Sequence, residues 1–174
     1  MKAATITQPL ASAAPAADDQ ILQPLNPQTL TVDIVLPVFN EAHMLEQSVT
    51  KLHKYLASNL PYKWRIVIAD NGSTDGTAAI ARRLAERYPD IRLLQLPEKG
   101  RGRALKQAWM SSRADILAYM DIDLSTNLDS FKPMITLLIT GDAGLVIGSR
   151  LMKQSRTTRG FKREFISRCY NRII

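Results

Sequence analysis

The chain has 174 residues, of which 45% are hydrophobic and 22% charged, and this is enough for one domain with a buried core, since domains most often have roughly 100 to 150 residues. A single cysteine, Cys169, excludes an internal disulfide framework and favours a reducing compartment, and the sequence contains no uninterrupted apolar run near the roughly 20 residues that a membrane-spanning helix requires. The formal net charge of +7 lies entirely in residues 150–174, where eight Lys and Arg stand against Glu164, and such a local excess predicts a surface that meets phosphates or anionic lipid.

Residues 1–30 form the first region of the chain. They are rich in Ala, Pro, Gln and Thr, follow no sustained hydrophobic period and contain little bulk to bury. We therefore predict a disordered lead-in. Pro9, Ser12, Pro15 and Asp18 interrupt the continuous apolar stretch that a secretory signal needs, so the segment is expected to remain on the protein.

The pattern changes at Val32, where short apolar runs begin to alternate with longer segments of helical period. This alternation is typical of a parallel sheet covered by helices, so the expected fold class is α/β. The apolar runs predict strands at residues 32–38, 64–70, 91–96, 116–121 and 143–148. The segments between them predict helices at residues 45–60, 80–88, 102–112 and 128–140. Pro133 is compatible with the last helix only in its first turn.

Polar residues follow four of these predicted strands. They are residues 37–41, 70–73, 121–123 and 148–150. In an open parallel sheet, ligands bind beyond the carboxyl ends of the strands. The sequence therefore predicts that four strand ends converge on one rim and form a ligand site there.

Asp121 and Asp123 are the most specific pair at this rim. Alternate residues of extended backbone point the same way, so the pair can present two carboxylates to one Mg²⁺ or Mn²⁺ ion. Such an ion would act as a Lewis acid on a departing diphosphate. A purely structural interpretation is that the two aspartates end a strand and cap the helix predicted at Leu128.

The segment 70–77 has a structural and a functional interpretation. Its glycines permit a tight strand-to-helix turn, and Ser73 or Thr74 is expected to cap the next helix. Asp70 at the strand end is suited to accept hydrogen bonds from a nucleobase N–H or a ribose hydroxyl. Glu41 is open to the same two interpretations, because negative charge also stabilises the start of a helix.

A short basic loop precedes the third predicted helix. Lys99, Arg101 and Arg103 alternate there with two glycines, which suits a phosphate anchor or a solvated loop. The loop matches neither a Walker motif nor a dinucleotide-binding fingerprint.

Five segments in fixed order carry a family resemblance. They are IVLPVFNE at 34–41, DNGSTDGT at 70–77, GRGRAL at 100–105, DIDLST at 121–126 and GSR at 148–150. Together they resemble the family 2 inverting glycosyltransferases of the GT-A fold, especially the branch that loads sugars onto dolichyl or other polyprenyl phosphates. The likeness covers about residues 32–171. It implies a Rossmann-like, mostly parallel sheet with helices on both faces.

The resemblance also implies roles for individual residues. The donor nucleotide sugar would be bound by Pro37, Phe39, Glu41, Asp70, Gly72 and Arg101. Asp121 and Asp123 would hold the metal and act in catalysis. Arg101 stands where relatives commonly carry Lys, and Asn71 replaces a frequent second Asp. Arg150 and Arg163 resemble positions that meet phosphate on the acceptor side, with Arg150 also catalytic.

The function implied is transfer of a hexose from UDP-glucose or GDP-mannose to a polyprenyl or dolichyl phosphate, with inversion. A phosphate acceptor is already an anion and needs no enzymic base, whereas a saccharide or other hydroxyl acceptor, the nearest alternative, would call for a carboxylate base. The catalytic domain is expected at residues 31–160, at the cytoplasmic face of a membrane, with no nucleic-acid partner.

Residues 161–174 predict a basic amphipathic helix. Phe161, Phe165 and Tyr170 lie on its apolar side, opposite Lys162 and Arg163 among other cations, which suits either a membrane interface or packing on further protein. Because the relatives continue through further acceptor-site elements, the resemblance implies that the chain stops inside this helix, which leaves the activity of this chain open.

Two functions of other classes remain open at this stage. An apolar strand ending in Asp121-X-Asp123 followed by Ser125 also resembles the first motif of aspartate-nucleophile phosphohydrolases. However, Asp142 and Glu164 are the only acidic residues after Asp129, which provides poorly for that family's later acidic pair. The second alternative is a non-catalytic basic module that binds membranes or nucleic acid through its charged end.

Overall fold

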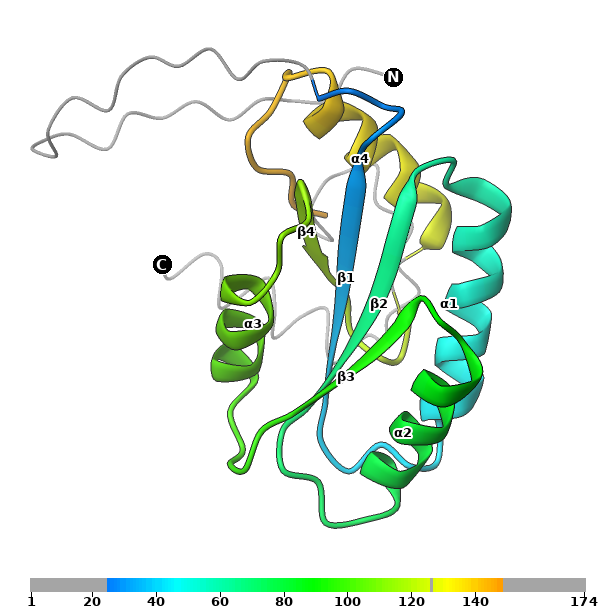
Figure 1. Cartoon of the computed structure of the whole chain (residues 1–174), viewed down its shortest axis with the longest axis vertical. Helices are drawn as coiled ribbons and strands as arrows, with labels where there is room; N and C mark the ends of the chain where they lie inside the picture. Colours follow the sequence, from blue (N-terminus) through cyan, green and yellow to red (C-terminus); the bar gives the residue numbers. More distant parts are fainter. Residues whose placement is uncertain (1–24, 126, 149–174) are drawn as a thin grey trace, which may run out of the picture.

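The computed structural model describes residues 25–125 and 127–148, and within them four strands form one parallel sheet with helices on both faces (Figure 1). The strands are β1 (Thr31–Val38), β2 (Lys63–Asp70), β3 (Ile91–Gln95) and β4 (Ile116–Tyr119). The helices are α1 (Leu45–Asn59), α2 (Thr77–Arg87), α3 (Arg101–Met110) and α4 (Phe131–Ile139), with a 3-10 turn η1 (Leu128–Ser130) before α4. The strand order is β3-β2-β1-β4. The predicted α/β class is confirmed.

Alternation along the central strand β1 divides the core into two layers. Ile34 and Leu36 are fully buried on the face covered by α1, α2 and α4, where they meet leucines such as Leu52. Val35 points to the other face, where α3 packs through small side chains such as Ala104. Figure 1 shows α3 on the side of the sheet opposite to α1 and α2. A strand buried on both faces reads as a continuous apolar run, which is why β1 was recognisable in the sequence.

The strand register brings the functional segments to one edge. Val38 pairs with Asp70, and Asp70 pairs with Gln95, so β1, β2 and β3 end at the same level. On the other side of β1, Tyr119 pairs with Val35. The residues that follow β4 therefore run alongside the last residues of β1.

Two predicted strands differ from the structure. β4 ends at Tyr119 because the chain turns soon afterwards: Leu124 adopts φ 47° and its N–H donates to the carbonyl of Asp121 at 3.1 Å. The predicted strand at 143–148 is wrong. That segment has no regular structure, and Leu145 and Ile147 are 78% and 75% exposed. Its apolar residues find no neighbouring strand among the described residues, and a strand without a partner is not stable.

The predicted lead-in is too long at its carboxyl end. Leu25 donates its N–H to the carbonyl of Ile139 at 3.2 Å, and Leu30 is only 2% exposed. Asn26 organises the turn between them, because its carbonyl accepts the N–H groups of Thr29 and Leu30. Residues 25–30 thus belong to the folded unit, while 1–24 lie outside the described residues.

The predicted helices are all present, with Pro133 in the first turn of α4 as required. Among the residues described, none of the helices combines the length and apolar character needed to cross a membrane. The predicted helix at 161–174 lies outside the described residues, as do residues 149–160 of the expected catalytic domain.

Candidate functional site

A pocket of about 320 Å³ lies beyond the carboxyl ends of β1, β2 and β4. It is lined by Pro37, Val38, Phe39, Glu41, Met44, Asn71, Lys99, Arg101, Asp121, Ile122 and Asp123. Residues separated by more than eighty positions thus meet in one cavity, as the rule for parallel sheets predicts.

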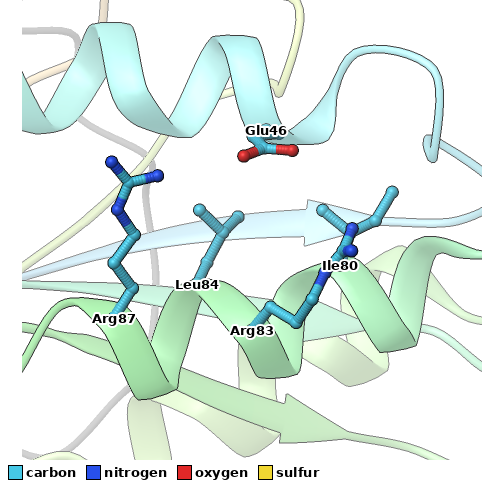
Figure 2. Close-up of a pocket in the computed structure, with 5 residues that line it drawn as sticks. All are labelled: Glu46, Ile80, Arg83, Leu84 and Arg87. Atoms are coloured by element: carbon cyan, nitrogen blue, oxygen red, sulfur yellow. The ribbon is translucent and has the colours of Figure 1, made fainter.

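A second pocket, of about 230 Å³, lies between α1 and α2 and is lined by Glu46, Ile80, Arg83, Leu84 and Arg87. Figure 2 shows the carboxylate of Glu46 facing the side of α2 that carries Arg83 and Leu84. None of the predicted site residues lines it. We therefore place the functional site in the pocket at the strand ends.

The loops after β1 and β2 are joined by hydrogen bonds that shape one side of the site. The N–H of Asn40, a residue at φ 56°, donates to Oγ of Ser73 at 3.0 Å, and the N–H of Thr74 donates to Oδ1 of Asn40 at 2.9 Å. The N–H of Glu41 donates to Oγ1 of Thr77 at 2.8 Å. Glu41 is thereby fixed at the pocket wall by the start of α2.

Gly76, and not the predicted Ser73 or Thr74, stands at the N-cap of α2, directly after Asp75. Oδ1 of Asp75 accepts the N–H of Thr77 at 2.9 Å, and its Oδ2 accepts the N–H of Ala42 in the other loop at 3.1 Å. The cap prediction was wrong because α2 begins at Thr77, three residues after Thr74 and four after Ser73, and the side chains of Ser73 and Thr74 bond Asn40 instead.

The hydrogen bonds of Asp75 make the stability of the contact between the loops after β1 and β2 depend on pH. The Thr77 hydroxyl, followed by the N–H groups of Thr77 and Ala42, holds the pKa of the Asp75 carboxyl below its ordinary value. Because the pKa of this carboxyl is lower in the folded state, its stabilisation of the fold is complete at a pH above the pKa in the unfolded state, about 3.9. The stabilisation is lost as the pH falls through the pKa of the folded state. Asp75→Asn should therefore lower the urea midpoint of unfolding clearly at pH 7 and less at pH 3, which lies below the unfolded value. Glu86→Gln, which removes an exposed carboxylate of α2, is the control. Equal losses at both pH values would contradict this role.

Two residues predicted to bind the donor do not line the pocket. Asp70 is 2% exposed, and its Oδ1 accepts the N–H of Ser73 at 3.2 Å. Gly72 adopts φ +73°, and a Cβ at that position would lie 3.1 Å from the carbonyl oxygen of Pro97. Both therefore shape the turn after β2. The residue that directly follows β2, Asn71, does line the pocket, although it was not among the predicted site residues.

The acidic pair does line the pocket, beside the basic loop. Oδ1 of Asp121 accepts a hydrogen bond from Nη2 of Arg101 at 2.5 Å, and Oδ1 of Asp123 accepts the N–H of Ser125 at 3.0 Å. The structural interpretation of the pair as a helix cap is wrong, because Asn127 caps η1 by accepting the N–H of Asp129.

Of the three cations at 99–103, Lys99 precedes α3 and the two arginines lie in its first turn rather than in the predicted loop. Two of the three, Lys99 and Arg101, line the pocket. Nζ of Lys99 lies 4.1 Å from the centre of the Phe39 ring, and the Arg101 guanidinium lies 5.6 Å from the Tyr119 ring centre. Arg103 forms an ion pair with Glu98 and does not line the pocket. Arg150 and Arg163 lie outside the described residues, so their predicted phosphate contacts remain predictions.

The donor set fits a divalent cation that is shared with a ligand. No group of three or more His, Cys, Asp or Glu that could hold a metal occurs in the described ranges. Of the three acidic residues that line this pocket, Asp121 and Asp123 are the neighbouring pair that would hold the ion, and Glu41 is the third. Mg²⁺ is usually bound through one or two carboxylates together with substrate phosphates and water. The pocket thus suits an ion that arrives with a diphosphate.

The fold and the site define an α/β domain of the GT-A glycosyltransferase type. Residues 33–174 match the family model described as glycosyl transferase family 2. The chain belongs to glycosyl transferase family 2, which confirms the resemblance and decides against the phosphohydrolase alternative.

Relatives of known name agree with this membership. The chain is 34% identical over 145 residues to glycosyltransferase AglD of Haloferax volcanii, with 82% of this chain and 23% of that protein covered. It is 29% identical over 160 residues to a dolichyl-phosphate β-glucosyltransferase of Trichomonas vaginalis, with 86% and 48% covered. It is 30% identical over 152 residues to a dodecaprenyl-phosphate galacturonate synthase of Rhizobium johnstonii, with 84% and 43% covered. The chain thus spans less than half of the length of each of these relatives.

Solved structures show the same fold. A mannosyltransferase from Pyrobaculum calidifontis in complex with GDP-Man and Mn²⁺ is 27% identical, with a TM-score of 0.54 and coverage of 66% of this chain and 34% of that one. Glucosyl-3-phosphoglycerate synthase from Mycobacterium tuberculosis with Mn²⁺, UDP-glucose and phosphoglyceric acid is 29% identical, with a TM-score of 0.50 and coverage of 65% and 40%.

Proposed function

We propose that this chain forms the donor-binding part of a hexosyltransferase that moves a hexose from UDP-glucose or GDP-mannose to a polyprenyl or dolichyl phosphate, with inversion. The observation that carries the proposal is the shared pocket, in which the carboxylates of Asp121 and Asp123 lie with Lys99 and Arg101 beside the apolar end of β1. The names of the relatives from Trichomonas and Rhizobium support a polyprenyl phosphate acceptor.

The pocket has the two halves that a nucleoside diphosphate sugar needs. Pro37, Val38 and Phe39 offer apolar contact to a nucleobase at the end of β1. The charged half lies towards β4, where Arg101 pairs with Asp121. A guanidinium is suited to bind phosphate oxygens through charge-assisted hydrogen bonds.

With a phosphate as acceptor, the transfer is a direct displacement at the anomeric carbon of the donor sugar. An oxygen of the acceptor phosphate, already an anion, attacks the anomeric carbon and forms a new bond to it, while the bond from that carbon to the donor diphosphate breaks. The nucleoside diphosphate leaves with the bonding electrons. Direct displacement from an α-linked donor gives a β-linked product.

The residues at the charged end would stabilise the leaving group. Arg101 and Lys99 would balance the charge that grows on the departing diphosphate. A Mg²⁺ or Mn²⁺ ion held by Asp121 and Asp123 would act on the same diphosphate as a Lewis acid. Arg150 and Arg163 are proposed to orient the acceptor phosphate.

The acceptor side of the proposal rests on the charge pattern of the sequence. Residues 150–174 carry the whole net charge of +7, and clusters of Lys and Arg bind anionic lipid surfaces. We therefore place the enzyme at the cytoplasmic face of a membrane, where a lipid-linked phosphate is presented.

A transfer assay tests this function. Purified protein is incubated with Mn²⁺ and either UDP-glucose or GDP-mannose, with polyprenyl phosphate presented in anionic vesicles at low and high salt. The expected product is a polyprenyl phosphate β-hexoside, with less product at high salt because screening weakens the surface contact. Vesicles that carry polyprenol in place of its phosphate are the control. Transfer to the alcohol, or to a soluble saccharide only, would contradict the proposed acceptor.

A further inference from the structure

The outward side of α3 combines positive charge with an exposed apolar side chain. Residues 99–113, which contain this helix, carry five Lys and Arg and no Asp or Glu. Lys106 and Met110 lie one turn apart on the side of the helix that faces away from the sheet, and Arg113 follows just beyond its end. All three are exposed, and Met110 is 79% exposed. This side of α3 therefore offers cations and an apolar contact together.

The cations on this side of α3 are available to an external partner. In the part of the chain that the structure describes, neither Lys106 nor Arg113 forms an ion pair. Arg103, at the beginning of the same helix, differs because it pairs with Glu98. Lys106 and Arg113 can thus meet anions outside the domain without first breaking an internal contact.

Two apolar side chains of β4 extend this surface. Leu117 and Tyr119 are alternate residues of the strand and so point to the same face of the sheet, and the Tyr119 ring lies 6.1 Å from the ring of Trp109 in α3. Because α3 packs on β1 and β2, Leu117 and Tyr119 remain 40% and 48% exposed. With Met110 they are three of the five large apolar side chains that are exposed in the described ranges. Apolar exposure is therefore concentrated beside the unpaired cations.

We propose that Lys106, Met110 and Arg113, with the exposed face of β4, form a docking surface for a bilayer of anionic lipids. Cations beside exposed apolar side chains suit a boundary where phosphate headgroups cover acyl chains, whereas nucleic acid would use the cations alone. α3 begins at the pocket with Arg101, so a membrane that lies along α3 reaches the pocket. The inference rests on the proposed function for the presence of a membrane, and it adds a second contact to residues 150–174.

A fluorophore at position 110 tests which side of the protein meets the membrane. Met110→Cys is labelled with NBD in a Cys169→Ser background, and the full chain is mixed with vesicles of phosphatidylglycerol and phosphatidylcholine. The NBD emission should rise and shift to the blue, with little change on pure phosphatidylcholine, because the cations need anionic lipid. Lys51→Cys carries the same label on α1, at the other face of the sheet, and should keep the emission it has in water.

Charge variants measure what the cations contribute. One Lys or Arg near an anionic surface strengthens binding by about fivefold, so Lys106→Gln/Arg113→Gln should weaken vesicle binding by about twentyfold at low salt. Lys51→Gln/Lys54→Gln removes the same charge from exposed positions of α1 and should change binding by less than about twofold. Residues 150–174 are present in both variants, so their contribution cancels in the comparison. Cosedimentation with the vesicles provides the measurement.

Failure of this inference differs from failure of the proposed function. If the protein sediments with the vesicles while the label at position 110 keeps its emission in water, or if the two double variants lose equal affinity, α3 does not face the bilayer and the inference is overturned. Transfer to polyprenyl phosphate then still decides the proposed function. If the label responds and the double variants differ as expected but no hexose is transferred, the docking surface stands and the proposed function fails.

Discussion

Asp123→Ala is expected to abolish the metal-dependent part of nucleotide-sugar binding. Asp123 is one of three acidic residues that line the pocket, with Asp121 and Glu41, and no larger group of metal-binding side chains exists in the described ranges to replace it. Loss of residues that merely support a metal ligand already costs about tenfold to a hundredfold in metal affinity, so loss of a ligand should cost at least as much. Titration of UDP-glucose or GDP-mannose with Mn²⁺ and with EDTA measures the effect.

Two further variants make the Asp123 experiment specific. Asp123→Asn keeps the size of the side chain and should show the same loss, which separates ligation from packing. Asp129→Ala removes an exposed carboxylate of η1 that does not line the pocket and should bind as the parent does. Metal-dependent binding of parental strength by Asp123→Ala would refute the assignment of the ligand.

Arg101→Gln is expected to strengthen the binding of Mn²⁺ alone and to weaken the binding of nucleotide in the presence of Mn²⁺. In the structure Arg101 pairs with Asp121 at 2.5 Å, so the guanidinium occupies the carboxylate that the ion requires. Both side chains are about half exposed, at 56% and 47%, so the pair contributes at most about 1 kcal/mol and its loss should strengthen binding of free Mn²⁺ by up to about fivefold. With UDP or GDP present the same variant loses a cation that faces diphosphate, and affinity should fall about tenfold.

Arg103→Gln provides the matched control for Arg101. Arg103 lies two residues further along, in the first turn of α3 like Arg101, but it pairs with Glu98 and does not line the pocket. Neither Mn²⁺ binding nor nucleotide binding should change in this variant. Paramagnetic resonance of Mn²⁺ measures the free ion, and calorimetry measures the nucleotide. A decrease in both affinities for Arg101→Gln would show that the arginine does not compete with the ion.

Much of the fold could be predicted because its signals are local. β1 to β3 were located to within one residue at each end, since strands buried on both faces appear as continuous apolar runs. The segment 143–148 has the same local signal but no strand beside it, and pairing is a non-local property that an apolar run does not reveal. β4 was drawn too long because the turn at Leu124 depends on a positive φ that leucine rarely adopts.

The part of the site that lies at the carboxyl ends of the strands could be predicted from the sequence. Pro37, Phe39, Glu41, Arg101, Asp121 and Asp123 were predicted and line one pocket. Asp70 was predicted because it stands at the strand end and because the resemblance implies a nucleoside contact there, yet its carboxylate bonds the N–H of Ser73 within the turn, and the pocket is lined by Asn71 instead. The available signal is that adjacent residues of extended backbone point to opposite sides, so Asp70 and Asn71 are expected to face different surfaces.

A crystal structure of the protein with Mn²⁺ and UDP or GDP tests the central claim most directly. The account predicts one anomalous manganese peak in contact with the carboxylate of Asp123 and with the nucleotide's diphosphate, with Asp121 released from Arg101 to face the same ion. A nucleotide bound in the pocket with manganese absent, or manganese held away from both aspartates, would contradict it.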